Sequence, residues 1–292
     1  MTAPPPAPWR VVIITVLPVV AQNYSEAIRS LGHEPVAVIT PRRRSRDAPP
    51  MPFAAAHVAD DPPELDILFA ATKHSLTRLL RAYAPDLAIC TGFPWLIQQE
   101  AIDIPRLGIV NGHPSLLPRY RGPFPIAWAI RNGETEIGMS FHLMDAAFDT
   151  GNVLAQMPIV LAEDDTEETL FARFPAVVSQ LMPIVFDRLA AGDRGDPQEG
   201  GEYQSMFEAE YWTIDPAKPA AEVHRQVRAW SFIPPFAQGL GPFLERDGER
   251  VRVTRTSLTE VDGATVLECT DGPLWIVETE PVQPGAPGAA FR

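Results

Sequence analysis

The stretch Val11-Val12-Ile13-Ile14-Thr15-Val16 indicates the fold class of this protein. All six residues are β-branched and five are apolar, a composition typical of a strand that is buried on both faces of a sheet. Strands and helices alternate beyond it: a helix over 21–31, a strand over 34–39, a helix over 66–83, a strand over 86–91 and a short strand that ends at Val110. This alternation predicts an α/β domain with a Rossmann-like, mostly parallel sheet. No Gly-x-Gly-x-x-Gly follows the first strand, so an NAD enzyme is not favoured.

A change of composition after residue 190 predicts a second domain. Residues 191–206 are rich in glycine, aspartate and glutamate and form the best linker candidate. Asp-Gly turns separate three short strand-like segments in the remainder: 251–254, 265–268 and 274–277. The sequence therefore predicts a catalytic domain over 1–190, a linker over 191–206 and a small antiparallel, OB-like β-barrel over 207–292. Pro175 and Pro183 should kink or divide a helix that is predicted over 167–191.

The composition is typical of a soluble protein of the cytoplasm. Hydrophobic residues make up 46% of the chain and charged residues 21%, and no run approaches the ~18 to 20 apolar residues of a membrane span. The two cysteines, Cys90 and Cys269, lie far apart, which argues against a disulfide framework or a cysteine-based metal site. The spacing of five of the six histidines is not typical of a metal site: His33, His57, His74, His142 and His224. We therefore expect a cytoplasmic protein with no metal site and no membrane partner.

The most informative polar residues follow the strand that ends at Val110. The sequence reads Asn-Gly-His-Pro-Ser-Leu-Leu-Pro-Arg-Tyr-Arg-Gly over 111–122 and Met-Asp-Ala-Ala-Phe-Asp-Thr-Gly over 144–151. These two segments, in this order, closely resemble the signature of the folate-dependent formyltransferases. That family of one-carbon transferases includes methionyl-tRNA formyltransferase, glycinamide ribonucleotide formyltransferase and several amino-sugar N-formyltransferases.

The resemblance implies a set of site residues. In the family, the residues that match Asn111, His113 and Asp149 are the catalytic trio, and 10-formyltetrahydrofolate is the co-substrate. The pterin of the folate lies against the positions that match six residues of this chain: Phe93, Trp95, Leu96, Ile97, Met144 and Asp145. Packing in the core is the alternative explanation for the three apolar residues at 95–97. The family needs no metal.

The chemistry of formyl transfer gives each member of the trio a role. The amine attacks the formyl carbon and a tetrahedral oxyanion forms, so the reaction needs a donor for the oxyanion, a base for the amine proton and a group that fixes the base. Asn111 offers an N–H donor, His113 a base of suitable pKa, and Asp149 a carboxylate that can hold the imidazole or an ordered water. A spacing of two in an extended segment points Asn111 and His113 to the same side. We expect the loop of Asp149 to meet them at one end of the sheet.

The sequence favours a small amine as the formyl acceptor: an amino sugar, an amino acid or a biosynthetic intermediate. The formal net charge is −13, and residues 207–292 hold eight Arg or Lys against thirteen Asp or Glu, whereas a surface that binds tRNA is usually basic. The alternative acceptor is initiator methionyl-tRNA. Four arginines that match a basic loop of methionyl-tRNA formyltransferase support it: Arg42, Arg43, Arg44 and Arg46. The alternative explanation for these arginines is a solvated surface loop. A further alternative is a formyltetrahydrofolate hydrolase, in which water replaces the amine.

Overall fold

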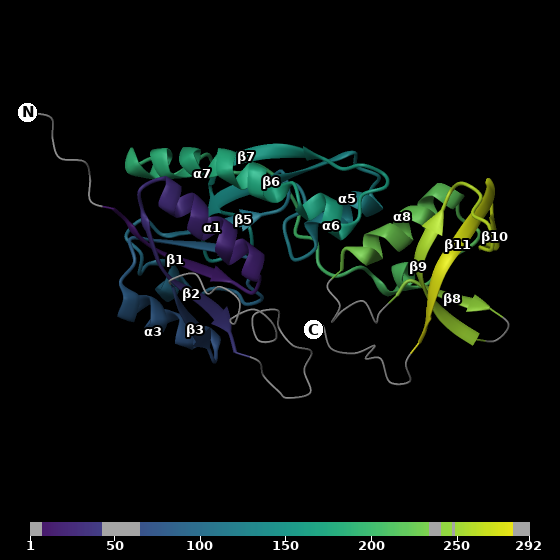
Figure 1. The fold of residues 1–292 in the computed structure, drawn as a ribbon, viewed down its shortest axis with the longest axis horizontal. Helices are drawn as coiled ribbons and strands as arrows, with labels where there is room; N and C mark the ends of the chain where they lie inside the picture. The colour runs from purple at the N-terminus through teal and green to yellow at the C-terminus, as the bar shows by residue number, and fades with distance from the viewer. Residues whose placement is uncertain (1–7, 43–64, 234–240, 247–248, 283–292) are drawn as a thin grey trace, which may run out of the picture. The chain divides into compact units, whose positions relative to one another are not determined.

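A seven-stranded sheet with the strand order β3-β2-β1-β4-β5-β6-β7 organises the first part of the chain (Figure 1). The computed structural model describes residues 8–42, 65–233, 241–246 and 249–282. The strands are β1 Arg10–Thr15, β2 Glu34–Pro41, β3 Asp66–Ala70, β4 Leu87–Thr91, β5 Ile109–His113, β6 Glu136–Leu143 and β7 Val153–Val160. Strands β1 to β5 pair in parallel, and β6 is antiparallel to β5. The predicted Rossmann-like, mostly parallel sheet is confirmed.

Helices cover both faces of this sheet. Strand β1 is therefore buried on both sides, as its β-branched residues predict. The helices packed here are α1 Pro18–Ser30, α3 Lys73–Tyr83, α4 Gln99–Ile102 and α7 Phe174–Ala190. Val12 and Ile14 share a buried cluster with Leu76 and Leu80 of α3. Helices α1 and α7 pack together on the other face.

The helix predicted over 66–83 is wrong in its first part. Residues 66–70 form β3, which pairs in parallel with β2, and α3 begins only after Thr72. The Thr72 hydroxyl accepts a hydrogen bond from Ser75 N, and Ser75 Oγ accepts one from Thr72 N. This reciprocal cap fixes the helix start. An apolar run next to a good helix pattern cannot be told from the helix itself without knowing its partner strand.

The helix predicted over 167–191 is divided into α6 Glu167–Phe171 and α7. Pro175 lies in the first turn of α7, where a missing N–H costs nothing, whereas Pro183 lies inside the helix. The segment Glu167–Ala190 is long and apolar enough to cross a membrane by length and composition alone. In the structure α7 buries seven side chains, Val177, Val178, Leu181, Met182, Val185, Phe186 and Leu189, within the folded protein.

A four-stranded antiparallel sheet with the order β10-β11-β9-β8 organises the last part of the chain. Its strands are β8 Phe243–Arg246, β9 Glu249–Ser257, β10 Thr265–Cys269 and β11 Gly272–Pro281. Helix α8 Ala220–Ser231 packs on it through Val223 and Val227, which share a core with Val253 and Leu274. Among the described residues the sheet is a curled half-barrel of four strands, and not a closed barrel.

The chain divides into two compact units. The first unit comprises residues 1–121, 138–159 and 172–202, and the second comprises 122–137, 160–171 and 203–292. The second unit also holds α5 Pro125–Arg131, α6 and a short 3₁₀ turn at Ala209–Trp212. Most of the segment predicted as a linker thus belongs to the first unit.

Candidate active site

Strand β5 presents Asn111 and His113 with a glycine between them. Gly112 is required here, because a Cβ at this position would lie 2.5 Å from the Tyr24 hydroxyl and 2.6 Å from Thr91 Oγ1. Those two hydroxyls are hydrogen-bonded to each other at 2.7 Å. One side of the strand is therefore filled by a packed polar pair, and the two functional side chains lie on the other side, as their spacing predicts.

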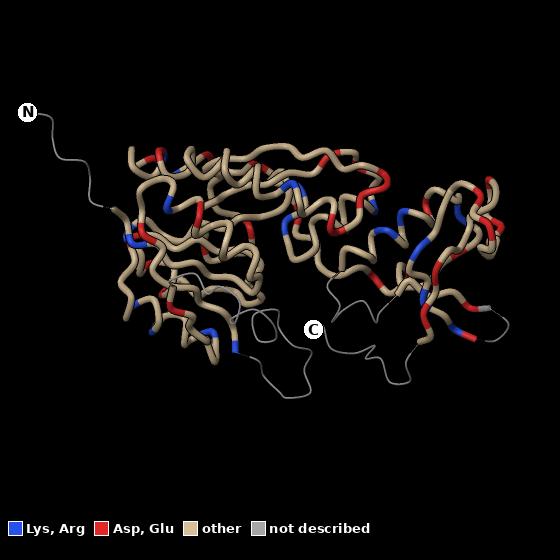
Figure 2. Tube along the Cα trace, viewed as in Figure 1, with Lys and Arg blue, Asp and Glu red and all other residues tan. Residues whose placement is uncertain are grey.

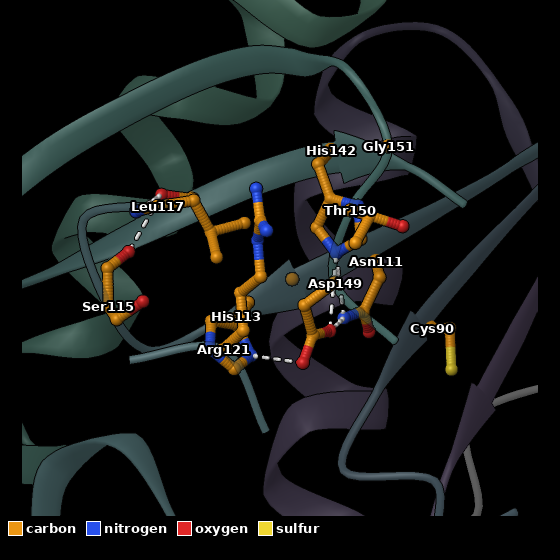
Figure 3. Close-up of polar contacts among 12 residues, drawn as sticks. Cys90, Asn111, His113, Ser115, Leu117, Arg121, His142, Asp149, Thr150 and Gly151 are labelled. Carbon is orange, nitrogen blue, oxygen red and sulfur yellow. Dashed lines mark hydrogen bonds and ion pairs between the residues drawn. The ribbon is translucent and has the colours of Figure 1, made fainter. Parts of the chain in front are cut away.

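Asp149 lies beside both side chains (Figure 3). Its Oδ1 accepts a hydrogen bond from Asn111 Nδ2 at 3.2 Å. Its Oδ2 lies 3.7 Å from His113 Nδ1, which is an ion-pair distance and too long for a direct hydrogen bond. The structure thus brings together the three residues that the resemblance implies.

The loop that carries Asp149 does not follow the predicted course, in which it meets Asn111 and His113 at one end of the sheet. Strand β6 is antiparallel to β5, and Val110 pairs with Leu143 at its end. The loop 144–152 therefore starts beside the beginning of β5, where Met144 N donates to Ile109 O at 2.8 Å. The carboxyl ends of the two strands do not meet at one end of the sheet. Instead the loop folds back, and Asp149 takes a left-handed backbone conformation with φ +57°.

His142 is a member of the site that the sequence analysis did not select. It is buried, and it faces Asn111 across the paired strands. Its Nδ1 lies 3.0 Å from Leu143 O, its Nε2 lies 3.1 Å from Asn111 Nδ2, and the same Nε2 lies 3.5 Å from Asp149 Oδ1. A carbonyl only accepts, so Nδ1 carries the proton and Nε2 accepts from the Asn111 amide. In the sequence His142 is only one of the residues that alternate with apolar ones over 137–143. Strand pairing is needed to show that Asn111 is its partner.

The environment of His113 favours the neutral imidazole. Burial lowers the pKa of His113, while Asp149 and the Tyr120 carbonyl raise it and His142 lowers it, so that the pKa lies below its usual value. Its Nε2 donates to the Tyr120 carbonyl at 2.9 Å. In the neutral form the lone pair is therefore on Nδ1, the atom that faces Asp149. That nitrogen can accept a proton.

The candidate folate residues fall into two groups. Ile97 is buried in the core, in line with the packing alternative. Phe93, Trp95 and Met144 are only partly buried and pack against the same cluster as Ile97, and Leu96 is partly exposed. Phe93 and Trp95 meet edge to face, with ring centroids 5.4 Å apart.

Asp145 stabilises its own loop. Its Oδ1 accepts from Thr150 Oγ1 at 2.6 Å and from Ala147 N at 3.1 Å. A carboxylate that accepts a backbone N–H two residues on is a common device of irregular loops.

Ser115 is a local structural residue. Its hydroxyl donates to the Arg119 carbonyl at 2.7 Å, so it is not aligned with His113 as a hydrolase nucleophile would be. In the part of the chain that the structure describes, no three histidine, cysteine or acidic side chains are grouped as metal ligands.

Comparisons with known proteins identify the family of this chain. The family model for formyl transferases matches residues 11–186. Methionyl-tRNA formyltransferase of Pelobacter propionicus is 32% identical over 268 residues, which is 87% of this chain and 83% of that protein. A sugar N-formyltransferase from Shewanella has a similar fold, with a TM-score of 0.62, 17% identity and coverage of 87% of this chain and 99% of that chain. HypX from Aquifex aeolicus, solved in complex with tetrahydrofolic acid, has a TM-score of 0.67 at 18% identity; the alignment covers 94% of this chain and only 44% of HypX.

The chain belongs to the formyl transferase family. It is a folate-dependent formyltransferase, and 10-formyltetrahydrofolate is the formyl donor of that family.

Proposed function

We propose that Asn111, His113 and Asp149 carry the transfer of the formyl group from 10-formyltetrahydrofolate to a primary amine. The observation that supports these roles is the contact of one carboxylate, Asp149, with both other side chains. The amine nitrogen attacks the formyl carbon, and the carbonyl oxygen becomes an oxyanion that Asn111 Nδ2 stabilises. Nδ1 of His113 takes the amine proton, directly or through a water held by Asp149. The oxyanion then collapses to a carbonyl, the C–N bond to the folate N10 breaks, and N10 leaves with the proton that His113 took from the amine.

The Asn111 amide must release a partner for this to happen. Its two N–H groups point to His142 Nε2 and to Asp149 Oδ1. The bond to Asp149 is the longer one, at 3.2 Å. We infer that the oxyanion replaces Asp149 as the acceptor, while His142 keeps the amide in place.

The donor would lie on the partly buried apolar residues beside the trio. Phe93, Trp95, Leu96 and Met144 offer an apolar surface for a pterin ring. Ile97 supports that surface from the core, and Asp145 stabilises the loop that carries Asp149. The tetrahydrofolic acid complex of HypX, which has a similar fold, supports a folate in this type of domain.

As acceptor we propose the amine of methionyl-tRNA. A relative that aligns over 87% of this chain and 83% of its own length is a methionyl-tRNA formyltransferase. This finding supports the alternative of the sequence analysis better than its preferred small amine. Of the four arginines that suggested tRNA, only Arg42 belongs to the described residues; Arg43, Arg44 and Arg46 lie outside them.

A small amine, such as that of an amino sugar, is the second candidate, because the cations of the second unit are largely paired with acids. Each pair lies within that unit: Arg131 with Glu208, Lys218 with Glu222, Arg250 with Glu245, Arg252 with Glu280 and Arg255 with Glu278. Figure 2 shows acidic and basic residues interspersed along β9 and β11. A surface that neutralises phosphates needs cations that are not already neutralised.

Turnover of 10-formyltetrahydrofolate with initiator methionyl-tRNA, and separately with a set of sugar nucleotides bearing a primary amine, tests the acceptor. With tRNA as the substrate, apparent affinity should fall steeply between ~50 and ~200 mM salt, and replacing Arg42, Arg43, Arg44 and Arg46 by alanine should flatten that slope. Turnover with the sugar nucleotides alone, with little salt dependence, would decide for the small amine. Release of formate without any amine would indicate the hydrolase. No turnover of the folate under any of these conditions would contradict the proposed roles.

A further inference from the structure

The segment 195–201, predicted as part of a linker, contacts the loop that carries Asp149. Val153 and Asp196 exchange two backbone hydrogen bonds, each 2.9 Å from N to O, in an isolated antiparallel bridge. At Gly195, with φ +81°, a Cβ would lie 2.8 Å from Val153 O, so glycine allows this close approach. The segment is therefore attached to the start of β7, within the first unit.

One side chain of this segment, Gln198, binds the backbone on both sides of Thr150. Its Nε2 donates to Asp149 O at 2.9 Å and to Gly151 O at 2.7 Å. Each amide hydrogen of Gln198 thus binds one carbonyl of this irregular loop. These carbonyls are not paired in a sheet or helix, so the side chain supplies the donors that they need. Gln198 binds the backbone of Asp149, whereas the carboxylate of Asp149 contacts Asn111 and His113.

Arg121 determines the orientation of the Gln198 amide. The guanidinium donates to Gln198 Oε1 from Nε at 3.1 Å and from Nη2 at 2.8 Å, and its Nη1 donates to Gly201 O at 3.3 Å. A guanidinium only donates, so the amide oxygen must face it and the amide nitrogen must face the two carbonyls. The opposite rotamer would place donors against donors.

The loop needs such support at Asp149. A residue other than glycine at φ +57° is less stable than in the right-handed conformation, because its Cβ lies too close to the backbone. Asp145 holds the loop from within, through Ala147 N and Thr150 Oγ1. Gln198 is the side chain that holds it from a different part of the chain.

We propose that Gln198, oriented by Arg121, is a positioning residue for formyl transfer. By fixing the carbonyls of Asp149 and Gly151, it keeps the Asp149 carboxylate within reach of Asn111 and His113. This proposal rests on the catalytic role that is proposed above for Asp149. It assigns a function to a segment that the sequence presents only as a linker.

Three variants separate donation by Gln198 from mere packing. Gln198→Met keeps the length of the side chain and removes both donors. Gln198→Glu also removes the donors and keeps an acceptor for Arg121, but its second oxygen faces the carbonyls of Asp149 and Gly151, which also only accept. Gln180→Met is the matched control, because Gln180 is exposed on α7 and donates one hydrogen bond to Ala176 O.

We expect Gln198→Met and Gln198→Glu to lower kcat by ~10- to 100-fold, because a displacement of about 1 Å in a catalytic group can have that effect. The KM for 10-formyltetrahydrofolate should change little, and kcat is measured well below the melting temperature of each variant. Methionyl-tRNA is the acceptor probe, or the amino sugar nucleotide if the wild type uses only that. The control should keep the wild-type kcat. A wild-type kcat in Gln198→Glu would overturn the proposal.

A readout that needs no acceptor is the titration of His113 followed by NMR in wild type and Gln198→Met. Asp149 and His142 are the titratable groups that act on His113, and Asp149 raises its pKa. If Asp149 loses its position, the midpoint of His113 should move to lower pH; an unchanged midpoint would count against the proposal. Asp149→Asn is measured alongside. If it keeps the wild-type kcat, the role of Asp149 fails and this proposal fails with it. If it is inactive while Gln198→Met is fully active, only the role of Gln198 is overturned.

Discussion

The side-chain nitrogen of Asn111 lies 3.1 Å from Nε2 of His142, its partner across the paired strands β5 and β6. The other ring nitrogen of His142 donates to Leu143 O, so Nε2 can only accept. This relationship fixes which end of the Asn111 amide faces the site. His142 thus determines that Asn111 presents donors, and not its oxygen, to a developing oxyanion.

We predict that His142→Leu lowers kcat by about tenfold, on the scale of one lost hydrogen bond of 0.5–1.5 kcal/mol. The leucine fills the buried site but gives Asn111 no acceptor, so the amide loses its fixed orientation. His142→Gln, which can offer a side-chain oxygen to Asn111, should retain more activity than His142→Leu. Steady-state kinetics of both variants test this, and equal activity of His142→Leu and the wild type would disprove it.

Asn111→Ala should lower kcat by ~10²- to 10³-fold, the usual effect of removing one oxyanion donor. The affinity for the folate should change much less, because the donor is needed mainly in the transition state. Single-turnover rates and equilibrium binding of tetrahydrofolate separate the two effects. Turnover at the wild-type level would remove Asn111 from the mechanism.

The activity should rise with pH as His113 loses its proton, because only the neutral imidazole can act as a base. Burial, the largest influence, lowers the pKa of His113, so the acid limb of the kcat/KM profile should lie below the ordinary histidine value of about 6.5. His113→Asn should be folded by circular dichroism and nearly inactive. If an active His113→Asn showed the same acid limb, another group would be the base.

Gly151→Ala should destabilise the protein and lower its activity together. A Cβ at this position would lie 1.7 Å from Leu143 O, a backbone atom that cannot move without displacing the loop. Such crowding typically costs ~1–3 kcal/mol or more. Gly192→Ala is the reference variant: Gly192 has φ +75°, so a side chain there is strained by the backbone conformation, but a Cβ would meet nothing within 4 Å. Urea unfolding should show a larger loss for Gly151→Ala than for Gly192→Ala.

Dialysis against a strong chelator should leave kcat unchanged. The expected chemistry takes its oxyanion donor from Asn111 and its base from His113, so no step requires a Lewis acid. The measurement is turnover of 10-formyltetrahydrofolate before and after dialysis, with a divalent ion added back. Activity that is lost and then restored by the ion would show that a metal takes part.

The sequence by itself determined the parallel part of the first sheet. It also determined that the side chains of Asn111 and His113 lie on the same side of their strand. Both follow from local rules: β-branched runs that alternate with helices predict a parallel sheet, and a spacing of two in a strand gives a common side. The local pattern failed at residues 66–70, where an apolar run became a strand because β2 offers a partner edge.

Only the tertiary structure decided how the site is completed. The antiparallel course of β6 brings Asp149 to Asn111 by a loop that folds back, and strand register places His142 against the same amide. Gln198 binds that loop from a segment whose composition indicates only a linker. These contacts join residues 31 to 49 positions apart. Side-chain hydrogen bonds at such separations leave no periodicity in the sequence, because they depend on where the backbone of each segment is held in space.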